Sequence, residues 1–177
     1  MESTQFNTQI LNHSDKLFRL AKSILRDVDA AQDAVQDLIV KLWEKRYMLD
    51  EVENIQAFTM RSMRNLCLDT IRQNRDMDEL PVEFEYIELN PYQKTELKDL
   101  ASKVKRMIDN LPELQRTIIR MRDVEEMDIS EIAYITLLTE NAVSVNLSRA
   151  RQKIRDQILN EQKKVEETIS PSFLPSH

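Results

Sequence analysis

Glycine is absent from the sequence, although an average chain carries about 7%. A chain without glycine cannot form the Gly-rich loops that bind phosphates in Walker and Rossmann proteins, so those classes of nucleotide-binding enzyme are excluded. Its tight turns must use Asn, Asp or Pro, or must be joints between helices that need no positive φ. Alternating β-branched residues are also scarce, and together these absences predict an all-α protein.

Cysteine and histidine are nearly absent as well. The single cysteine, Cys67, cannot form an internal disulfide, and with only two histidines the chain offers no zinc cluster. Cys67 lies between Leu66 and Leu68 in a helical pattern, so we interpret it as a small helix residue rather than a reactive thiol. The sequence shows no Ser/His/Asp set either, and we therefore expect no catalytic residue, no metal site, no cofactor and no small-molecule substrate.

Long apolar runs are also missing. None approaches the roughly 20 residues that a membrane span needs, and Met1–Ile10 lacks the basic start and apolar core of a secretory signal. With 41% apolar and 32% charged residues the chain is expected to be globular. We expect a cytoplasmic protein.

The charges are distributed unevenly along the chain. The formal net charge of −6 argues against nucleic-acid binding, but the distribution matters more than the sum. Residues 77–100 carry seven acids and two lysines, hence −5. Residues 54–75 carry four arginines and one acid, hence +3, and residues 141–155 carry four basic residues and no acid, hence +4. The sequence therefore predicts two basic patches on either side of an acidic segment.

Apolar residues at helical spacing predict two groups of helices separated by the acidic segment, which holds Pro81 and Pro91 and shows no sustained period. We expect two small helical domains, residues 1–76 and 101–160, joined by an acidic linker, residues 77–100, and followed by a flexible tail, residues 161–177. The predicted helices span approximately residues 14–26, 29–46, 54–74, 95–108, 111–121, 129–137 and 140–160. Their predicted capping residues are Asp29 with Gln32, Asn54, Asn110 before Pro112, Asp128 with Glu131, and Thr139.

The sharpest local pattern lies between Asp128 and Arg155. A short helix containing the small residue Ala133 meets a turn of about three residues and then a longer helix, which is the geometry of a helix-turn-helix. The longer helix directs short polar residues and arginine outward, and such side chains can read base edges in a major groove or contact phosphates. An ordinary helical hairpin with a solvated basic end is the alternative. The predicted DNA-facing residues are Asn141, Ser144, Val145, Ser148, Arg149 and Arg151.

In order and spacing, residues 17–75 and 111–155 resemble regions 2 and 4 of bacterial sigma factors of the extracytoplasmic-function (ECF) group of the sigma-70 family. The chain departs from the usual pattern at Gln32, where the family has Glu, and at Met127 and Leu137, where it has glycine. The matching segments are Leu17–Ala21, Asp29–Asp37, Lys41–Trp43, Ala57–Phe58, Arg61, Arg64–Leu66, Asp69 and Arg72 in the first half, and Leu111–Arg116, Ser130–Ala133 and Ser148–Arg151 in the second.

The resemblance implies roles for residues of the first half. The exposed face of the second helix would dock on the clamp helices of the polymerase β′ subunit, with Trp43 as a core or domain-edge anchor. The third helix and the loop before it, Tyr47–Gln56, would bind and open the minus-ten element, where unpaired bases need stacking and bared phosphates need cations. The core-binding candidates are Asp33, Gln36, Asp37 and Lys41, and the minus-ten candidates are Arg61, Asn65 and Arg72, with Asp69 as an orienting partner for an arginine.

For the second half the resemblance implies that the helix-turn-helix reads the minus-thirty-five element of promoter DNA through its six predicted residues. Its other side would meet the polymerase β flap, and the acidic linker would thread toward the RNA exit path. An anti-sigma factor is the expected regulator.

Two other function classes stay open. A two-domain transcriptional regulator would need a ligand pocket or phosphoacceptor in the first half, and the sequence shows no receiver-type cluster of aspartates there. An interaction-only adaptor is the other alternative, and an enzyme is the least supported.

Overall fold

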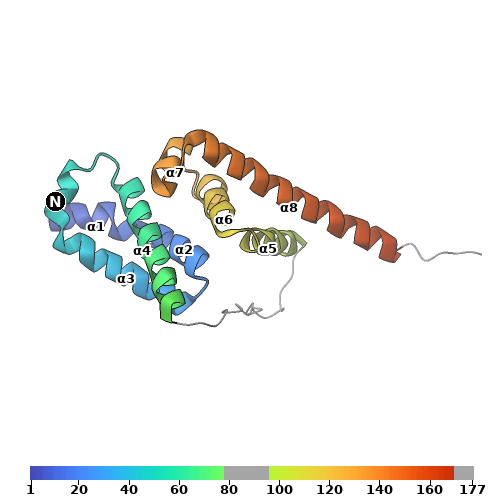
Figure 1. Ribbon diagram of the computed structural model, residues 1–177, viewed down its shortest axis with the longest axis horizontal. Helices are drawn as coiled ribbons and strands as arrows, with labels where there is room; N and C mark the ends of the chain where they lie inside the picture. The colour runs from blue at the N-terminus through green and yellow to red at the C-terminus, as the bar shows by residue number, and fades with distance from the viewer. Residues whose placement is uncertain (78–95, 170–177) are drawn as a thin grey trace, which may run out of the picture.

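The computed structural model describes residues 1–77 and 96–169, and all regular structure in these residues is helical, which confirms the predicted all-α class. We call residues 1–77 the N-terminal module and residues 96–169 the C-terminal module. The two modules lie side by side, and the last helix projects away from both (Figure 1). Most of the predicted linker and the end of the predicted tail lie outside the described residues.

The N-terminal module is a small bundle in which α2 packs against both α3 and α4. Its core is the apolar stripe of each helix, as periodicity predicts, and it contains the fully buried Leu17, Met63 and Cys67. The first helix and both 3-10 turns were not predicted. The elements are α1 (Ser3–Gln9), η1 (Leu11–His13), α2 (Ser14–Leu25), α3 (Val28–Glu44), η2 (Arg46–Glu51) and α4 (Ile55–Met77).

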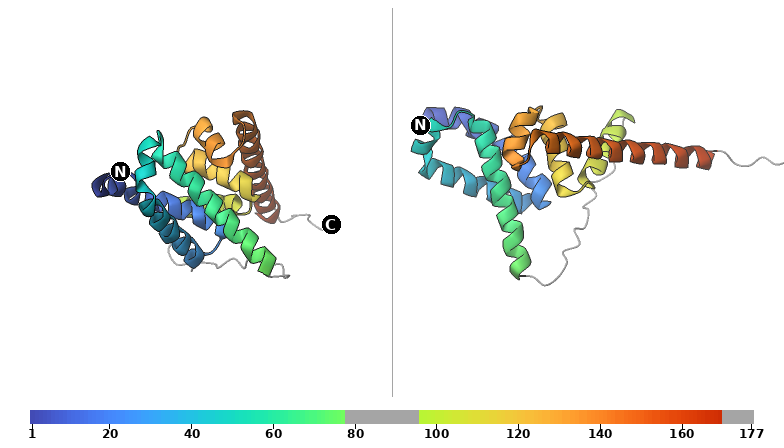
Figure 2. Two further views of the ribbon diagram at one scale, coloured as in Figure 1. Left: turned by 60° about the vertical axis from the view of Figure 1, so that its left-hand side comes forward. Right: turned by 45° about the horizontal axis from the view of Figure 1, so that its top comes forward.

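The C-terminal module packs α6 and α7 against the first half of α8 (Figure 2). Its core includes Ile118, Ile132 and Val143, all fully buried. The last helix runs on to Ile169, well past its predicted end at Asn160. The elements are α5 (Glu96–Asp109), α6 (Glu113–Ile119), the π-helical turn η3 (Arg120–Val124), α7 (Ile129–Thr136) and α8 (Glu140–Ile169).

Three of the five predicted helix caps are confirmed. Asn54 accepts a hydrogen bond from the Ala57 N–H at 2.9 Å, and Thr139 accepts one from the Ala142 N–H at 3.2 Å. At the start of α7, Asp128 and Glu131 form the reciprocal capping box.

The other two predicted caps are wrong. The start of α3 is capped by Asp27, whose carboxylate accepts the Ala30 N–H at 2.7 Å, so Asp29 already lies inside the helix. Asn110 does not cap α6, because a residue before proline avoids the helical region and Leu111 therefore cannot begin the helix. Pro112 itself takes the capping position, with φ −51° and ψ 146°.

Three residues of the described chain adopt positive φ without being glycine: Arg26 at 58°, Glu126 at 56° and Leu137 at 60°. Arg26 and Leu137 end α2 and α7, where helices commonly close with a left-handed residue. Of the two positions where the family usually has glycine, Leu137 takes this conformation and Met127 does not, since the left-handed residue there is its neighbour Glu126. A side chain in this conformation costs roughly 1–2 kcal/mol, so these turns carry strain that glycine would relieve.

The two modules are in contact rather than separated. Helix α4 packs against α7, and α2 packs against α6, so that the buried apolar residues of both modules form one continuous cluster. No described helix is both long and apolar enough to cross a lipid bilayer.

Candidate nucleic-acid and polymerase interfaces

The helix-turn-helix is formed by α7, α8 and the turn between them. Ala133 is 8% exposed and lets α7 lie close to α8, whose inner stripe includes the buried Val143 and Ala150. The turn is closed by the Leu138 N–H, which donates to the Ala133 carbonyl at 3.1 Å. The predicted packing of the two helices is therefore confirmed, with Leu137 in place of the usual turn glycine.

The outward face of α8 is open to solvent. All six residues predicted to face DNA are exposed: Asn141, Ser144, Val145, Ser148, Arg149 and Arg151. A shallow concavity runs beside this face, lined by Ser144, Leu147, Ser148, Arg151, Gln152 and Arg155.

One of the six residues already has a partner within the module. Arg151 donates two hydrogen bonds to the carboxylate of Asp123 in η3, at 2.5 and 3.2 Å. These bonds raise the pKa of Arg151 and hold its guanidinium at one side of the concavity. Arg149, by contrast, extends from the open face.

The four residues predicted for the minus-ten element divide into two groups. Asn65, Asp69 and Arg72 are exposed on α4, and Arg72 donates to the Asp69 carboxylate at 3.2 Å, as expected for an orienting partner. Arg61 is half-buried at the module interface, with its guanidinium 4.7 Å from the ring centroid of Tyr134. The structure thus brings Asn65, Asp69 and Arg72 together on open surface and places Arg61 against the helix-turn-helix.

The predicted base-reading loop contains two exposed side chains that sequence reasoning did not single out. Tyr47 is 69% exposed and Met48 is 56% exposed, while the neighbouring Leu49 is buried and anchors the turn. An aromatic ring and a long flexible apolar side chain adjacent in a polar loop are suited to stacking on unpaired bases. Because Tyr47 and Met48 are neighbours in the sequence, this pattern could have predicted them as base-contacting residues.

Trp43 lies at the edge of the N-terminal module, as predicted. Its ring makes an edge-to-face contact with Phe6 at 5.0 Å between centroids, and the Arg46 guanidinium lies 4.4 Å from the Trp43 ring. Phe6 belongs to the unpredicted helix α1 and is 2% exposed. Helix α1 therefore fixes the end of α3 from which the η2 loop departs.

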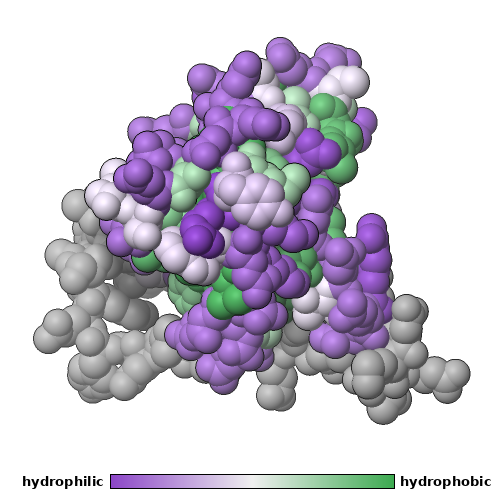
Figure 3. Space-filling view, turned by 90° about the vertical axis from the view of Figure 1, so that its left-hand side faces the viewer, coloured by the Kyte–Doolittle hydropathy of each residue, from purple (hydrophilic) through white to green (hydrophobic). Residues whose placement is uncertain are grey.

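The predicted core-docking residues lie on the outer face of α3. Asp33, Gln36, Asp37 and Lys41 are all exposed, opposite the buried stripe of the same helix. The end of the molecule where α1 and α3 lie is largely hydrophilic, with small hydrophobic patches (Figure 3).

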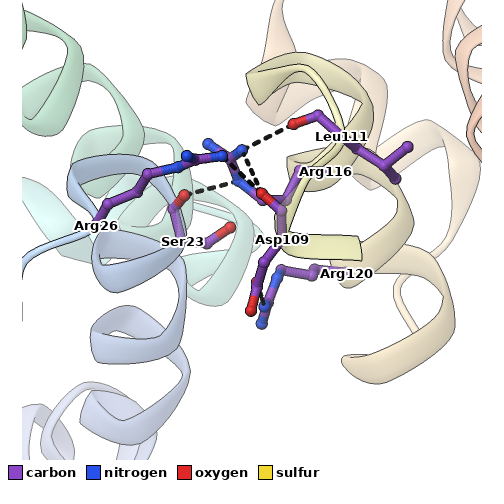
Figure 4. A network of polar contacts seen from close by, with 6 residues as sticks. All are labelled: Ser23, Arg26, Asp109, Leu111, Arg116 and Arg120. Carbon is purple, nitrogen blue, oxygen red and sulfur yellow. Dashed lines mark hydrogen bonds and ion pairs between the residues drawn. The ribbon is translucent and has the colours of Figure 1, made fainter. Parts of the chain in front are cut away.

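A buried arginine holds the two modules together. Arg116 of α6 is 4% exposed and donates to the carbonyls of Ser23 at 2.9 Å, Leu111 at 2.8 Å and Asp109 at 3.2 Å (Figure 4). Burial, reinforced by the neighbouring Arg26 cation, lowers the pKa of Arg116 to about 10. Arg26 crosses the same interface and donates to the Asp109 carbonyl at 2.6 Å.

A second cross-module contact is an ion pair. Arg19 of α2 donates two hydrogen bonds to Glu125, at 2.6 and 2.9 Å, and these bonds raise the pKa of Arg19. The side chain of Glu125 is only 8% exposed, and Lys16 approaches it at 4.0 Å. The contact is bidentate, the geometry in which an arginine–carboxylate pair is strongest.

Comparison with known proteins identifies the two modules separately. Residues 10–76 match the family described as Sigma-70 region 2, and residues 101–154 match Sigma-70, region 4. The RNA polymerase sigma factor SigV of Bacillus subtilis is 30% identical over 157 residues, which cover 87% of this chain and 91% of SigV. This chain is a sigma factor of the ECF group of the sigma-70 family.

Other ECF relatives agree. SigW of Bacillus subtilis is 22% identical over 82% of this sigma factor and 84% of SigW. Among solved structures, the sigma factor RpoE in complex with the anti-sigma factor NepR from Bartonella quintana has a TM-score of 0.70 at 24% identity, covering 86% of this chain and 96% of RpoE. CnrH in complex with the cytosolic domain of CnrY has a TM-score of 0.60 at 21% identity, covering 89% of both chains. These likenesses show that the fold is shared.

The matched regions place the candidate interfaces within this sigma factor. Region 2 contains α2, α3, η2 and nearly all of α4, and region 4 contains the helix-turn-helix. Helix α1, which contacts Trp43, and the end of α8 lie outside both matches.

Proposed function

We propose that this sigma factor binds core RNA polymerase and directs promoter-specific initiation, with region 2 acting at the minus-ten element and region 4 at the minus-thirty-five element. The observation that carries the proposal is the exposure of the outer face of α8, because region 4 must present that face to a major groove. An ordinary helical hairpin would also expose a polar face, so what favours DNA binding is the concavity beside it, which is lined by Arg151 and Arg155 and, among the described residues, by no acidic one.

For region 4 we propose that Ser144, Val145, Ser148 and Arg149 contact base edges and that Asn141 and Arg151 contact the backbone. Short side chains near the start of a recognition helix let it approach the groove closely, and Arg149 can take a guanine edge with two hydrogen bonds. Arg151, held by Asp123, is suited to a phosphate because its position is fixed and its Nη1 group is not used in that pair.

For region 2 we propose that Tyr47 and Met48 stack on unpaired bases of the opened minus-ten element. Asn65 is placed to donate to a base edge, and Arg72, oriented by Asp69, is placed to neutralise the strand phosphates. This division of labour follows from exposure, since all five side chains are open to solvent in the described structure.

Core polymerase is proposed to dock on the outer face of α3 through Asp33, Gln36, Asp37 and Lys41 at the β′ clamp helices. The far side of region 4 would meet the β flap. We further propose that the protein works in the cytoplasm, without catalysis of its own, and that residues 77–100 thread toward the RNA exit path.

Control by an anti-sigma factor is proposed because the structural relative RpoE was solved in complex with the anti-sigma factor NepR, and CnrH was likewise solved with a bound protein, the cytosolic domain of CnrY. An anti-sigma factor here would compete for the α3 face and for the outer face of α8.

The proposal is tested by mixing the purified protein with core polymerase and transcribing a library of linear promoters. Selective initiation that requires both components supports it, and sequence-specific duplex binding with no effect on initiation would indicate a polymerase-independent regulator. Asp33→Arg is expected to weaken core binding at least tenfold, since it places a cation in an acidic docking face. The matched control is Glu161→Arg, the same kind of charge reversal at an exposed α8 position outside both regions. Equal core affinity for both variants would show that the docking face lies elsewhere.

A further inference from the structure

Helix α7 of region 4 lies beside the N-terminal end of α4, the helix proposed to open the minus-ten element (Figures 1 and 2). Two of its side chains reach across. The ring of Tyr134 lies 4.7 Å from the Arg61 guanidinium, and the Glu131 carboxylate accepts a hydrogen bond from the Asn54 amide at 2.8 Å. The region 2 partners are therefore a cation that faces an aromatic ring and an amide that donates to an anion.

A single DNA strand offers the same two kinds of group as Tyr134 and Glu131, an aromatic ring and an anion. A base has a π face on which an arginine guanidinium stacks, and the strand has anionic and carbonyl oxygens that accept hydrogen bonds from an amide. We propose that Arg61 and Asn54 form a nucleotide-binding subsite for the opened strand, and that Tyr134 and Glu131 occupy it as an internal nucleic-acid mimic until the modules separate. The proposal deepens the minus-ten role proposed above and depends on it.

Local structure orients Asn54 and Glu131 for this contact. Asn54 caps α4 through its side-chain oxygen, which leaves its amide nitrogen directed away from the helix toward Glu131. Glu131 uses one carboxylate oxygen for the capping box, accepting the Asp128 N–H at 3.0 Å, and the other for Asn54. Each residue is thus held by its own helix terminus before the modules meet.

The position of Tyr134 favours a role as a mimic of a stacked base over a role in packing the core of region 4. It follows Glu131 by three residues and therefore shares the same face of α7. Its side chain is 43% exposed and is not part of the buried core of region 4, which Ile132, Ala133 and Ile135 supply. The helix-turn-helix does not need an aromatic ring at this position, whereas a mimic of a stacked base does.

The rest of the module interface holds the mimic in place. The bidentate Arg19–Glu125 pair and the hydrogen bond from Arg116 to the Ser23 carbonyl connect α2 to η3 and α6. Because Arg19 is 46% exposed, its pair with Glu125 is open to screening by salt. The closed arrangement is therefore one that a highly charged partner can open.

The test measures binding of a fluorescein-labelled single-stranded DNA 15-mer of random sequence to the full chain by fluorescence anisotropy. Tyr134→Ala is expected to bind the strand about two- to fivefold more tightly than the unmodified chain, as for loss of one surface cation–π contact. Tyr134→Phe keeps the ring and is the matched control, with unchanged affinity. Adding Arg61→Ala to Tyr134→Ala should abolish the gain, because the subsite itself is then removed.

A second pair of variants tests the same idea without touching α7. Arg19→Glu should open the interface, increase the radius of gyration in X-ray scattering and tighten strand binding, and Arg19→Glu with Glu125→Arg should restore both values. An opened chain that binds the strand no better, or a gain that survives Arg61→Ala, overturns the mimic. If these variants overturn the mimic but the unmodified chain still supports core-dependent initiation, only the further proposal is wrong and the sigma-factor proposal stands. If the unmodified chain does not support core-dependent initiation, both proposals are wrong.

Discussion

Arg116 is the residue whose replacement should most weaken the contact between the two modules. We consider Arg116→Met, which replaces the aliphatic stem of the side chain and removes the guanidinium. Three hydrogen bonds to backbone carbonyls disappear in this variant, and the Ser23 carbonyl lies in the last turn of α2, where no intrahelical donor is available to replace the lost one.

The size of the effect follows from two opposing contributions. Hydrogen bonds from a charged donor contribute roughly 1.5–3 kcal/mol each, so the three together contribute at most about 5–9 kcal/mol. The lowered pKa of Arg116, about 10 against an ordinary 12.5, corresponds to roughly 3 kcal/mol of unfavourable burial. We therefore expect Arg116→Met to lower the free energy of unfolding by about 2–6 kcal/mol, and Arg116→Lys, which can replace only part of the network, to lower it by about half as much.

Urea denaturation followed by far-ultraviolet circular dichroism measures this difference. The matched control is Arg122→Met, because Arg122 is an arginine of the same module whose hydrogen bond to the Met127 carbonyl, at 2.7 Å, and ion pair with Asp128, at 3.6 Å, both stay within that module. We expect the control to cost about 1 kcal/mol. A loss below about 1 kcal/mol for Arg116→Met would refute the view that this network joins the modules.

The remaining predictions concern three single residues. Phe6→Ala should cost about 3–5 kcal/mol of stability and shift the emission of Trp43, the only tryptophan of the sequence, and unchanged emission would show that Phe6 does not contact that ring. Burial raises the pKa of Cys67 to about 12 from 9.0, so a thiol reagent should label the chain at neutral pH only after urea is added, and labelling of the native chain would contradict this burial. Since the raised pKa disfavours the folded thiolate, stability should also fall as pH rises from about 9 toward 12, with Cys67→Ala as the variant that lacks this slope. Arg149→Ala should weaken minus-thirty-five selection by about 1–3 kcal/mol in competition binding, and an unchanged sequence preference would remove Arg149 from the base-reading set.

The sequence predicted the parts of the fold that are encoded locally. Apolar spacing located α2, α3 and α4, and the exposure of Asp33 and Asn65 followed because the opposite faces of their helices had to be buried. Helix α1 was missed because Phe6 and Ile10 form a single apolar pair in a polar stretch, too short to establish a period. That helix is stabilised by its contact with Trp43, which no local pattern reveals.

The contact between the modules could not be predicted for a related reason. Arg61, Tyr134 and Glu131 each look like ordinary solvated residues of their own helices, and only their meeting in space makes them complementary. The same holds for Arg116, which occupies a position where exposed arginine is common and is nevertheless 4% exposed. Spacing rules describe one helix at a time, whereas these four residues depend on the distance between two helices far apart in the chain.

The backbone of the π-helical turn η3 positions Glu125 for its contact with Arg19 of the other module. It leads into Glu125, whose N–H donates to the Arg120 carbonyl, the wider ring of a π-turn. Each residue of an α-helix advances the side-chain direction by about 100°, so deletion of the uncharged, exposed Val124 would swing Glu125 away from Arg19 without removing any charged group. The stability of the contact between the two modules can therefore change through the geometry of one helical turn, without any change in the residues proposed to contact polymerase or promoter.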